Sequence, residues 1–161
     1  MRRMVVFSSV LLVSGLLVIV LSAVQARSLA ESLQPDEAMA ATAKDLKSLQ
    51  GYWRLKELNI NNEKIEVPDY LARMHIAGDK LTPVGADGKE LGKFQSKIKL
   101  DATLDPKIVD LTFDTNTLEG IYKFEGKQWI VCVARENVKN RPTEFKAGQD
   151  VIYIVFEKEA D

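Results

Sequence analysis

The residue types most used in catalysis are scarce in this chain, which has one histidine, His75, and one cysteine, Cys132. Nucleophilic catalysis requires a nucleophile with a base and an orienting acid within reach. Met74 and Ile76 occupy the apolar phase around His75, so we expect its imidazole to face solvent. Cys132 lies in a wholly apolar run, where nothing stabilises a thiolate, and we interpret it as a small buried hydrophobe. These residues predict no catalytic pair, and we expect the protein not to be an enzyme.

Metal-binding and phosphate-binding patterns are also missing from the sequence. One cysteine excludes an intramolecular disulfide framework and a cysteine-based zinc site. Four aspartates cluster without the spacing of a calcium loop, and we expect them to be solvated turn residues: Asp101, Asp105, Asp110 and Asp114. No glycine-rich phosphate loop or Gly-x-Ser-x-Gly elbow occurs. We therefore expect neither a metal nor a cofactor.

The charge balance argues against a nucleic-acid partner. The chain of 161 residues has 22 Lys and Arg against 23 Asp and Glu, for a formal net charge of -1. Proteins that bind nucleic acid neutralise phosphates with a basic patch or stripe. We expect no nucleic-acid partner, which leaves a small ligand or another protein.

Aromatic residues and one arginine are the candidates for contacts with such a partner. Phe94 and Tyr122 fall on the apolar phase of alternating runs, and Trp129 begins an apolar run, so all three could contact an apolar ligand. Arg141 lies in a long connection between two apolar runs, where binding residues often concentrate. Each has a structural alternative, because a tryptophan can simply fill the core. Arg141 could equally pair with Glu144 or with backbone carbonyls to hold its loop in place.

Short β-prone runs separated by turn residues occupy the chain from Gly51 onward. Pairs such as Asn61-Asn62 and Gly78-Asp79 lie between successive runs and favour tight antiparallel hairpins. The predicted runs are 51–60, 62–67, 73–77, 79–84, 90–100, 107–113, 117–125, 127–135 and 149–158. One of the short early runs need not form a strand, so about eight strands are expected. Sequential hairpins favour a closed up-and-down barrel over a sandwich.

A helix is predicted before the strands. The segment is rich in Ala, Glu, Lys and Leu, Pro35 to Glu37 resembles a helix start, and Gly51 ends it. The runs 129–134 and 151–156 are apolar on both faces, so their outer sides need cover. We expect the helix over 38–49 to provide that cover. The predicted fold is mostly β, an antiparallel up-and-down barrel preceded by one N-terminal helix.

The N-terminal segment predicts export. Arg2 and Arg3 precede a stretch without charge that reaches Ala26, as in a signal peptide. We expect cleavage before Arg27, and the alternative is an uncleaved anchor over 4–21, since that run approaches the length of a membrane span. Both place the rest of the chain outside the cytoplasm, in the periplasm or the medium. The predicted organisation is a signal peptide over 1–26, a tether over 27–36 and one domain over 37–161.

Six segments between residues 45 and 158 resemble, in order and spacing, a domain of unknown function abundant in Planctomycetes: 49–53, 78–81, 110–112, 120–122, 131–135 and 141–145. That family is generally considered lipocalin-like and brings no biochemical activity with it. The helix followed by Gly51-x-Trp53 also resembles the opening motif of lipocalins, in which the tryptophan lies at the closed end of the barrel and packs against an arginine from near the last strand. The resemblance implies Arg135 or Arg141 as that arginine and leaves the choice open. The domain is short for a lipocalin, which implies a narrow or shallow barrel.

Two functions of different classes follow from this fold. The first is an exported lipocalin-like domain that binds a small apolar or amphipathic molecule in the barrel or at its mouth. The second is a structural or interaction module of the cell envelope, in which the barrel is filled and a partner protein docks on an edge strand or on the Arg141 loop. A cavity in the barrel favours the first function, and a sealed core favours the second.

Overall fold

The computed structural model describes residues 35–67, 69, 72–138 and 140–160. The predicted signal peptide and all but the last two residues of the predicted tether lie outside the described residues. Among the described residues, no helix is long and apolar enough to cross a membrane. Residues from Ala38 onward form one compact unit, which contains every strand of the described residues.

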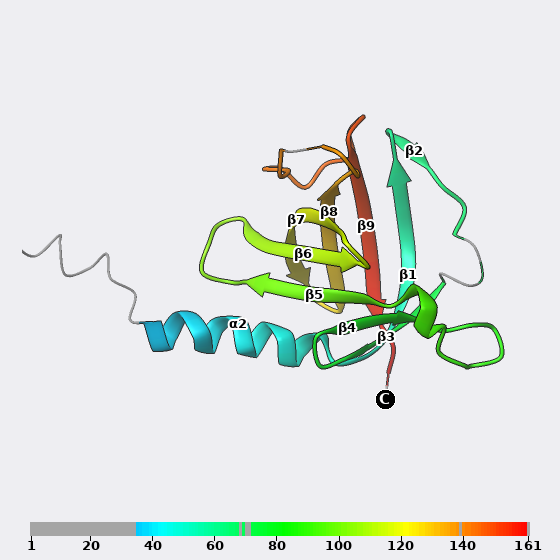
Figure 1. Ribbon diagram of the computed structural model, residues 1–161, viewed down its shortest axis with the longest axis horizontal. Helices are drawn as coiled ribbons and strands as arrows, with labels where there is room; N and C mark the ends of the chain where they lie inside the picture. The colour runs from blue at the N-terminus through cyan, green and yellow to red at the C-terminus, as the bar shows by residue number, and fades with distance from the viewer. Residues whose placement is uncertain (1–34, 68, 70–71, 139, 161) are drawn as a thin grey trace, which may run out of the picture. The chain divides into compact units, whose positions relative to one another are not determined.

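The predicted helix is present as α2 (Pro35–Leu49), which leads directly into the first strand (Figure 1). Its first turn carries Asp36 and Glu37 and its last turn carries Lys47, charges that suit the two ends of the helix dipole. Gly51 then adopts a positive φ of 105°, a conformation that glycine reaches without strain, and the chain turns into β1. The helix and the first strand are therefore adjacent in space as well as in sequence.

The described chain forms one antiparallel sheet of nine strands, drawn in Figure 1: β1 (Gly51–Ile60), β2 (Glu63–Lys64), β3 (Arg73–Ala77), β4 (Lys80–Pro83), β5 (Ser96–Asp101), β6 (Lys107–Phe113), β7 (Asn116–Glu125), β8 (Gln128–Ala134) and β9 (Val151–Lys158). Each strand from β3 to β9 pairs with the next, and β9 returns to pair with β1. This closes an eight-stranded up-and-down barrel, with β2 as one short extra strand on the end of β1. The predicted fold class is confirmed.

A bulge in β1 keeps the apolar side chains inside as the barrel closes. The β1–β9 register runs from the pair Trp53 and Lys158 to the pair Ile60 and Ile152, with a shift between Leu55 and Glu57. The extra residue changes the phase of the strand, so that Leu58 rather than Glu57 joins Leu55 in the apolar interior.

The predicted strand over 90–100 is wrong in its first half. The structure has a 3-10 turn, η2 (Gly92–Phe94), before β5 begins at Ser96. Backbone bonds hold this segment beside the end of β4, because Leu91 N donates to Pro83 O at 2.8 Å and Val84 bridges Glu90. The connection therefore folds over one end of the barrel instead of extending β5. The early run 62–67 is likewise reduced to the two residues of β2.

The predicted position of the helix, over the outer faces of β8 and β9, is also wrong. Leu46 and Leu49 instead pack with the core cluster inside the barrel, at the end where β1 begins. The outer side of β8 lies under the connection between β8 and β9, since the Lys146 backbone lies beside Cys132. In the same connection, Phe145 lies under Lys123 of β7, with its ring centroid 4.7 Å from Lys123 Nζ. A short helix tied to the start of β1 cannot reach that face, whereas a connection that leaves β8 itself can.

Candidate ligand cavity at the barrel mouth

A cavity of about 400 Å³ occupies the half of the barrel that lies away from α2. Every barrel strand contributes to its wall, and most of the wall is apolar, with Leu55, Leu58, Leu111, Leu118, Val133 and Ile154 among the lining residues. Leu118 lies beside the β6–β7 turn and Val133 near the end of β8, so the cavity opens at the end formed by these connections. This volume is within the range of small-molecule sites.

Aromatic side chains fill the other half of the barrel. Trp53, Tyr122 and Trp129 are each at most 2% exposed. The Trp129 ring meets Trp53 edge-on, with centroids 6.2 Å apart, and stacks on Phe156 at 5.1 Å. Phe156 lines the cavity, so this aromatic stack forms its floor.

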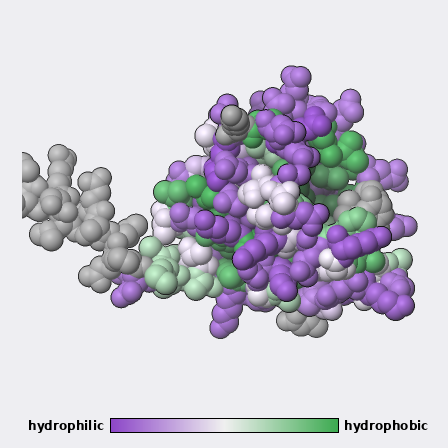
Figure 2. Space-filling model, in the orientation of Figure 1, coloured by the Kyte–Doolittle hydropathy of each residue, from purple (hydrophilic) through white to green (hydrophobic). Residues whose placement is uncertain are grey.

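Two phenylalanines stand at the mouth. Phe94 of η2 and Phe113 at the end of β6 both line the cavity, yet they are 47% and 38% exposed. Figure 2 shows a face that is largely hydrophilic, with hydrophobic atoms exposed only in small patches. Exposed aromatic rings around a concave apolar surface are typical of a binding site rather than of an ordinary protein surface.

Four of the lining residues carry polar side chains: Lys93, Gln95, Ser96 and Asp114. Gln95 Nε2 donates to Thr82 Oγ1 at 2.9 Å, and Lys93 Nζ lies 4.8 Å from the centroid of the Phe94 ring. Ser96 Oγ is buried and has no hydrogen-bond partner among the described residues. Three of the four come from the short segment 93–96, and β5 pairs with β6, which ends just before Asp114. The polar groups therefore gather on one side of an otherwise apolar mouth.

The connection that carries Phe94 is held from outside the barrel by His75. The His75 ring bonds Glu90 through Nδ1 and stacks on Tyr52, with the ring centroids 4.4 Å apart. The imidazole thus lies on the outer side of β3, as its phase predicted. Cys132, on β8, is fully buried, and this burial raises the pKa of its thiol to about 11. His75 contacts Tyr52 and Glu90, whereas Cys132 lies beside the backbone of Lys146.

The closed end has a different cation from the one that the lipocalin resemblance implied. Trp53 Nε1 donates to Leu49 O at 2.6 Å, and Lys158 Nζ lies 5.6 Å from the centroid of the Trp53 ring. Lys158 Nζ also donates to Ser48 O at 2.9 Å, which joins the end of β9 to the helix. The prediction of Arg135 or Arg141 is therefore wrong. Both arginines follow β8 at the mouth end, whereas β9 ends beside Trp53.

Arg135 and Arg141 have structural partners instead. Arg135 donates to Asn61 Oδ1 at 2.9 Å. Arg141 donates to the carbonyl of Gly120 at 2.6 Å and that of Val109 at 3.3 Å, and it pairs with Asp110 at 2.8 Å. Of the two interpretations of Arg141, the structure therefore supports the structural one, in which Arg141 bonds backbone carbonyls and holds its loop in place. A second hollow, of about 380 Å³, is lined only by residues 138–151, nearly all of them from that connection.

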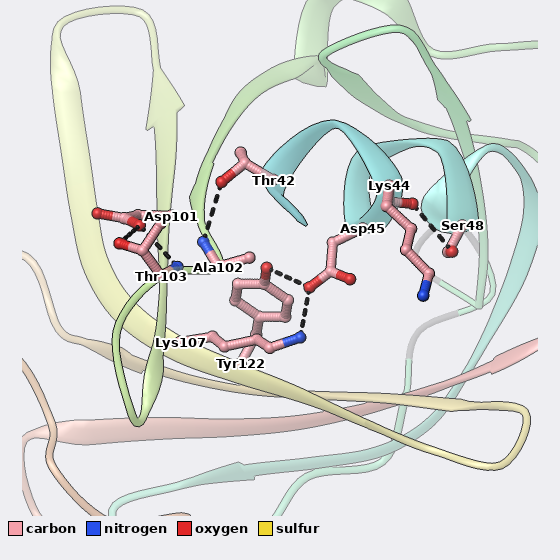
Figure 3. A network of polar contacts seen from close by, with 9 residues as sticks. All are labelled: Thr42, Lys44, Asp45, Ser48, Asp101, Ala102, Thr103, Lys107 and Tyr122. Carbon is pink, nitrogen blue, oxygen red and sulfur yellow. Dashed lines mark hydrogen bonds and ion pairs between the residues drawn. The ribbon is translucent and has the colours of Figure 1, made fainter. Parts of the chain in front are cut away.

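A polar network fastens the helix across the closed end (Figure 3). Asp45, 8% exposed, accepts the Tyr122 hydroxyl at 2.8 Å and Lys107 Nζ at 2.7 Å, both at Oδ2. Burial, together with the bond to Asp45, raises the pKa of Tyr122 well above its usual value. The Ala102 amide donates to Thr42 Oγ1 at 3.1 Å. The hydroxyl of Tyr122 is thus engaged in holding the helix.

The structure therefore divides the four predicted ligand contacts. Phe94 lines the cavity, Trp129 and Tyr122 belong to the filled half below it, and Arg141 lies outside the barrel. Sequence reasoning missed Phe113 and Ser96, although both fall on the inward phase of their strands. Among the described residues, no three His, Cys, Asp or Glu side chains are grouped in a way that could hold a metal ion.

Comparisons with protein families, with curated proteins and with solved structures gave no match for this chain.

Proposed function

We propose that this domain binds a small apolar or amphipathic molecule in the cavity at the barrel mouth. The observation that carries the proposal is the apolar cavity of about 400 Å³, which has exposed aromatic rings at its entrance. An eight-stranded barrel is just wide enough to be filled by side chains or to hold one small ligand. Here aromatic rings fill one half and aliphatic side chains line the other, which leaves room for the ligand.

The construction of the closed end supports the proposal. The Trp53–Leu49 bond, the Lys158–Ser48 bond and the Asp45 network hold the helix across the closed end of the barrel. A barrel that is held at one end in this way has its cavity before the ligand arrives, so binding costs little reorganisation. The lipocalin-like arrangement, with one closed end and one open end, supports the same function.

The alternative function, a structural module of the cell envelope, required a filled barrel. The cavity is the observation against it. We further propose that the domain works without catalysis and outside the cytoplasm. This rests on the arginines and the long uncharged stretch at the N-terminus, and on the absence of a catalytic pattern in the sequence.

The proposal is tested with N-phenyl-1-naphthylamine, an uncharged dye that fluoresces in apolar surroundings. We expect the full chain to bind the dye. The variant Leu118→Trp replaces an aliphatic side chain of the cavity wall with a large ring, and we expect it to bind the dye at least about tenfold more weakly. Thr117→Trp is the matched control, because Thr117 is the exposed neighbour on the other face of β7. Any dye that binds to the N-terminal apolar stretch contributes the same amount in all three proteins, so it does not affect the comparison. Equal binding by all three, or no binding, would overturn the proposal.

A further inference from the structure

We propose that Ser96 is the polar anchor of the cavity, and that the ligand is an amphipathic molecule with an apolar body and one uncharged hydroxyl or carbonyl head. This inference rests on the proposed function and specifies its ligand class. The anchor is the Ser96 hydroxyl, which hydrogen-bonds the head at the mouth while the body lies against the aliphatic wall and the Phe156 floor.

The position of Ser96 carries the inference. Ser96, Ile98 and Leu100 alternate with exposed lysines along β5, and the first of them lines the cavity. Ser96 is 1% exposed, and its Oγ has no partner among the described residues. Leaving a buried hydroxyl unpaired costs stability, and such groups in native proteins call for a partner. A ligand head in the cavity, reached by a turn of the Ser96 side chain, is the partner that we propose.

The neighbouring polar groups do not satisfy this hydroxyl. Gln95, the adjacent residue, is committed to Thr82. Trp129 Nε1 is the other buried polar atom without a partner in the described part of the chain, but Trp129 does not line the cavity. Ser96 is therefore the one described residue that combines an inward position, near-complete burial, an unpaired polar atom and a place in the cavity wall.

The charges around Ser96 favour an uncharged head. Lys93 and Asp114, one positive and one negative, both line this side of the mouth, so together they offer no net charge to an ionic head. Transfer of an ionised group to a site as buried as Ser96 is costly unless a counter-ion accompanies it. A hydroxyl or carbonyl can exchange a hydrogen bond with Ser96 Oγ at much lower cost.

The size of the cavity limits the body of the ligand. At about 30 Å³ for each water-sized group, a volume of about 400 Å³ holds on the order of a dozen non-hydrogen atoms. A two-ring aromatic alcohol or a medium-chain alcohol matches this volume. The test dye is larger than this, and the exposed rings of Phe94 and Phe113 are placed to contact the part of the dye that remains at the mouth.

The test compares two probes that differ only in a hydroxyl against a methyl group, 2-naphthol and 2-methylnaphthalene, as competitors of the dye on the full chain. Ser96→Ala is expected to lower the affinity for 2-naphthol about three- to tenfold, because one hydrogen bond is lost. The affinity for 2-methylnaphthalene should stay unchanged. The same variant should keep or raise the melting temperature, since it removes an unpaired polar group. Thr82→Val is the matched control: it removes a paired buried hydroxyl and should lower the melting temperature while both probes keep their relative affinities.

The outcomes separate the two proposals. If the dye binds, but Ser96→Ala lowers the affinity for both probes equally or changes neither affinity, the anchor is overturned and the proposed function stands. If Ser96→Ala lowers the melting temperature as Thr82→Val does, the hydroxyl has a structural partner and the anchor is again overturned. Tighter binding of 2-naphthoate than of 2-naphthol would overturn the uncharged head. Absence of dye binding to the unmodified chain would overturn the proposed function itself.

Discussion

The two ends of the barrel are made from the same strands but are completed in opposite ways. At the end near α2, Trp53, Tyr122 and Trp129 fill the interior, and Asp45 has a partner for its buried oxygen. At the mouth, Phe94 and Phe113 leave much of their surface exposed, and the Ser96 hydroxyl is unpaired. The difference teaches that one small barrel separates a filled half, which provides stability, from a half that stays hollow.

Side-chain size explains the difference. The inward positions near the mouth are occupied by aliphatic residues such as Leu118, Val133 and Ile152, which do not reach across the barrel. Those near the helix include two tryptophans in edge-on contact. Because an eight-stranded barrel is near the limit at which side chains can fill it, this change of residue type decides which half stays hollow.

The largest effect is expected from truncating the aromatic core of the closed end. Trp53→Ala should lower the free energy of unfolding by about 3–5 kcal/mol, because it leaves a large cavity and removes the bond to Leu49 O. Phe94→Ala at the mouth should cost less than about 1 kcal/mol, because that ring is half exposed. Urea unfolding of the two variants measures the contrast. Equal losses would mean that the ends do not differ as described.

A smaller effect is expected from the polar network of the closed end. Asp45→Ala leaves the buried Tyr122 hydroxyl without its acceptor, which should cost about 1–3 kcal/mol. Tyr122→Phe combined with Asp45→Ala should cost less than the sum of the two single changes, because the pair shares one bond. Additive losses in urea unfolding would show that the bond contributes nothing to stability.

The loop outside the barrel should affect stability and leave binding unchanged. Arg141→Ala removes a charge-assisted bond to Asp110 and two to backbone carbonyls, at a cost of about 1–2 kcal/mol. Dye affinity should stay the same, since Arg141 does not line the cavity. Urea unfolding and dye titration on the same sample measure both quantities. A selective loss of affinity with unchanged stability would move Arg141 into the binding site.

The smallest effect is expected at Cys132, which should not react in the folded protein. Its pKa of about 11 leaves the thiol almost entirely protonated at pH 8, and burial keeps reagents away. A thiol reagent such as 5,5′-dithiobis(2-nitrobenzoate) should therefore label the chain only as fast as it unfolds. Labelling at pH 8 that outpaces unfolding would show that the connection over β8 opens while the barrel stays closed.

Much of the architecture could be predicted from local patterns. The alternation in β6 and β7 and the paired turn residues between strands specified hairpins, and successive hairpins favoured closure. The alternation along β5 also assigns Ser96 to the inward face of that strand, so its burial follows from the local pattern. The missing partner of its hydroxyl does not follow from that pattern, because a hydrogen bond depends on which atoms of other strands come near.

The sequence by itself determined the order of the elements, the antiparallel barrel and the inward face of most strands, because these depend on period-two alternation and on turn residues close by in the chain. Only the tertiary structure decided that Lys158 rather than an arginine packs on Trp53, that the helix closes an end rather than covering β8, and that a cavity remains at the mouth. Each of these depends on how β9 returns to β1 and on how the volumes of side chains from eight strands sum within one barrel. Such long-range geometry leaves no trace in any short stretch of sequence.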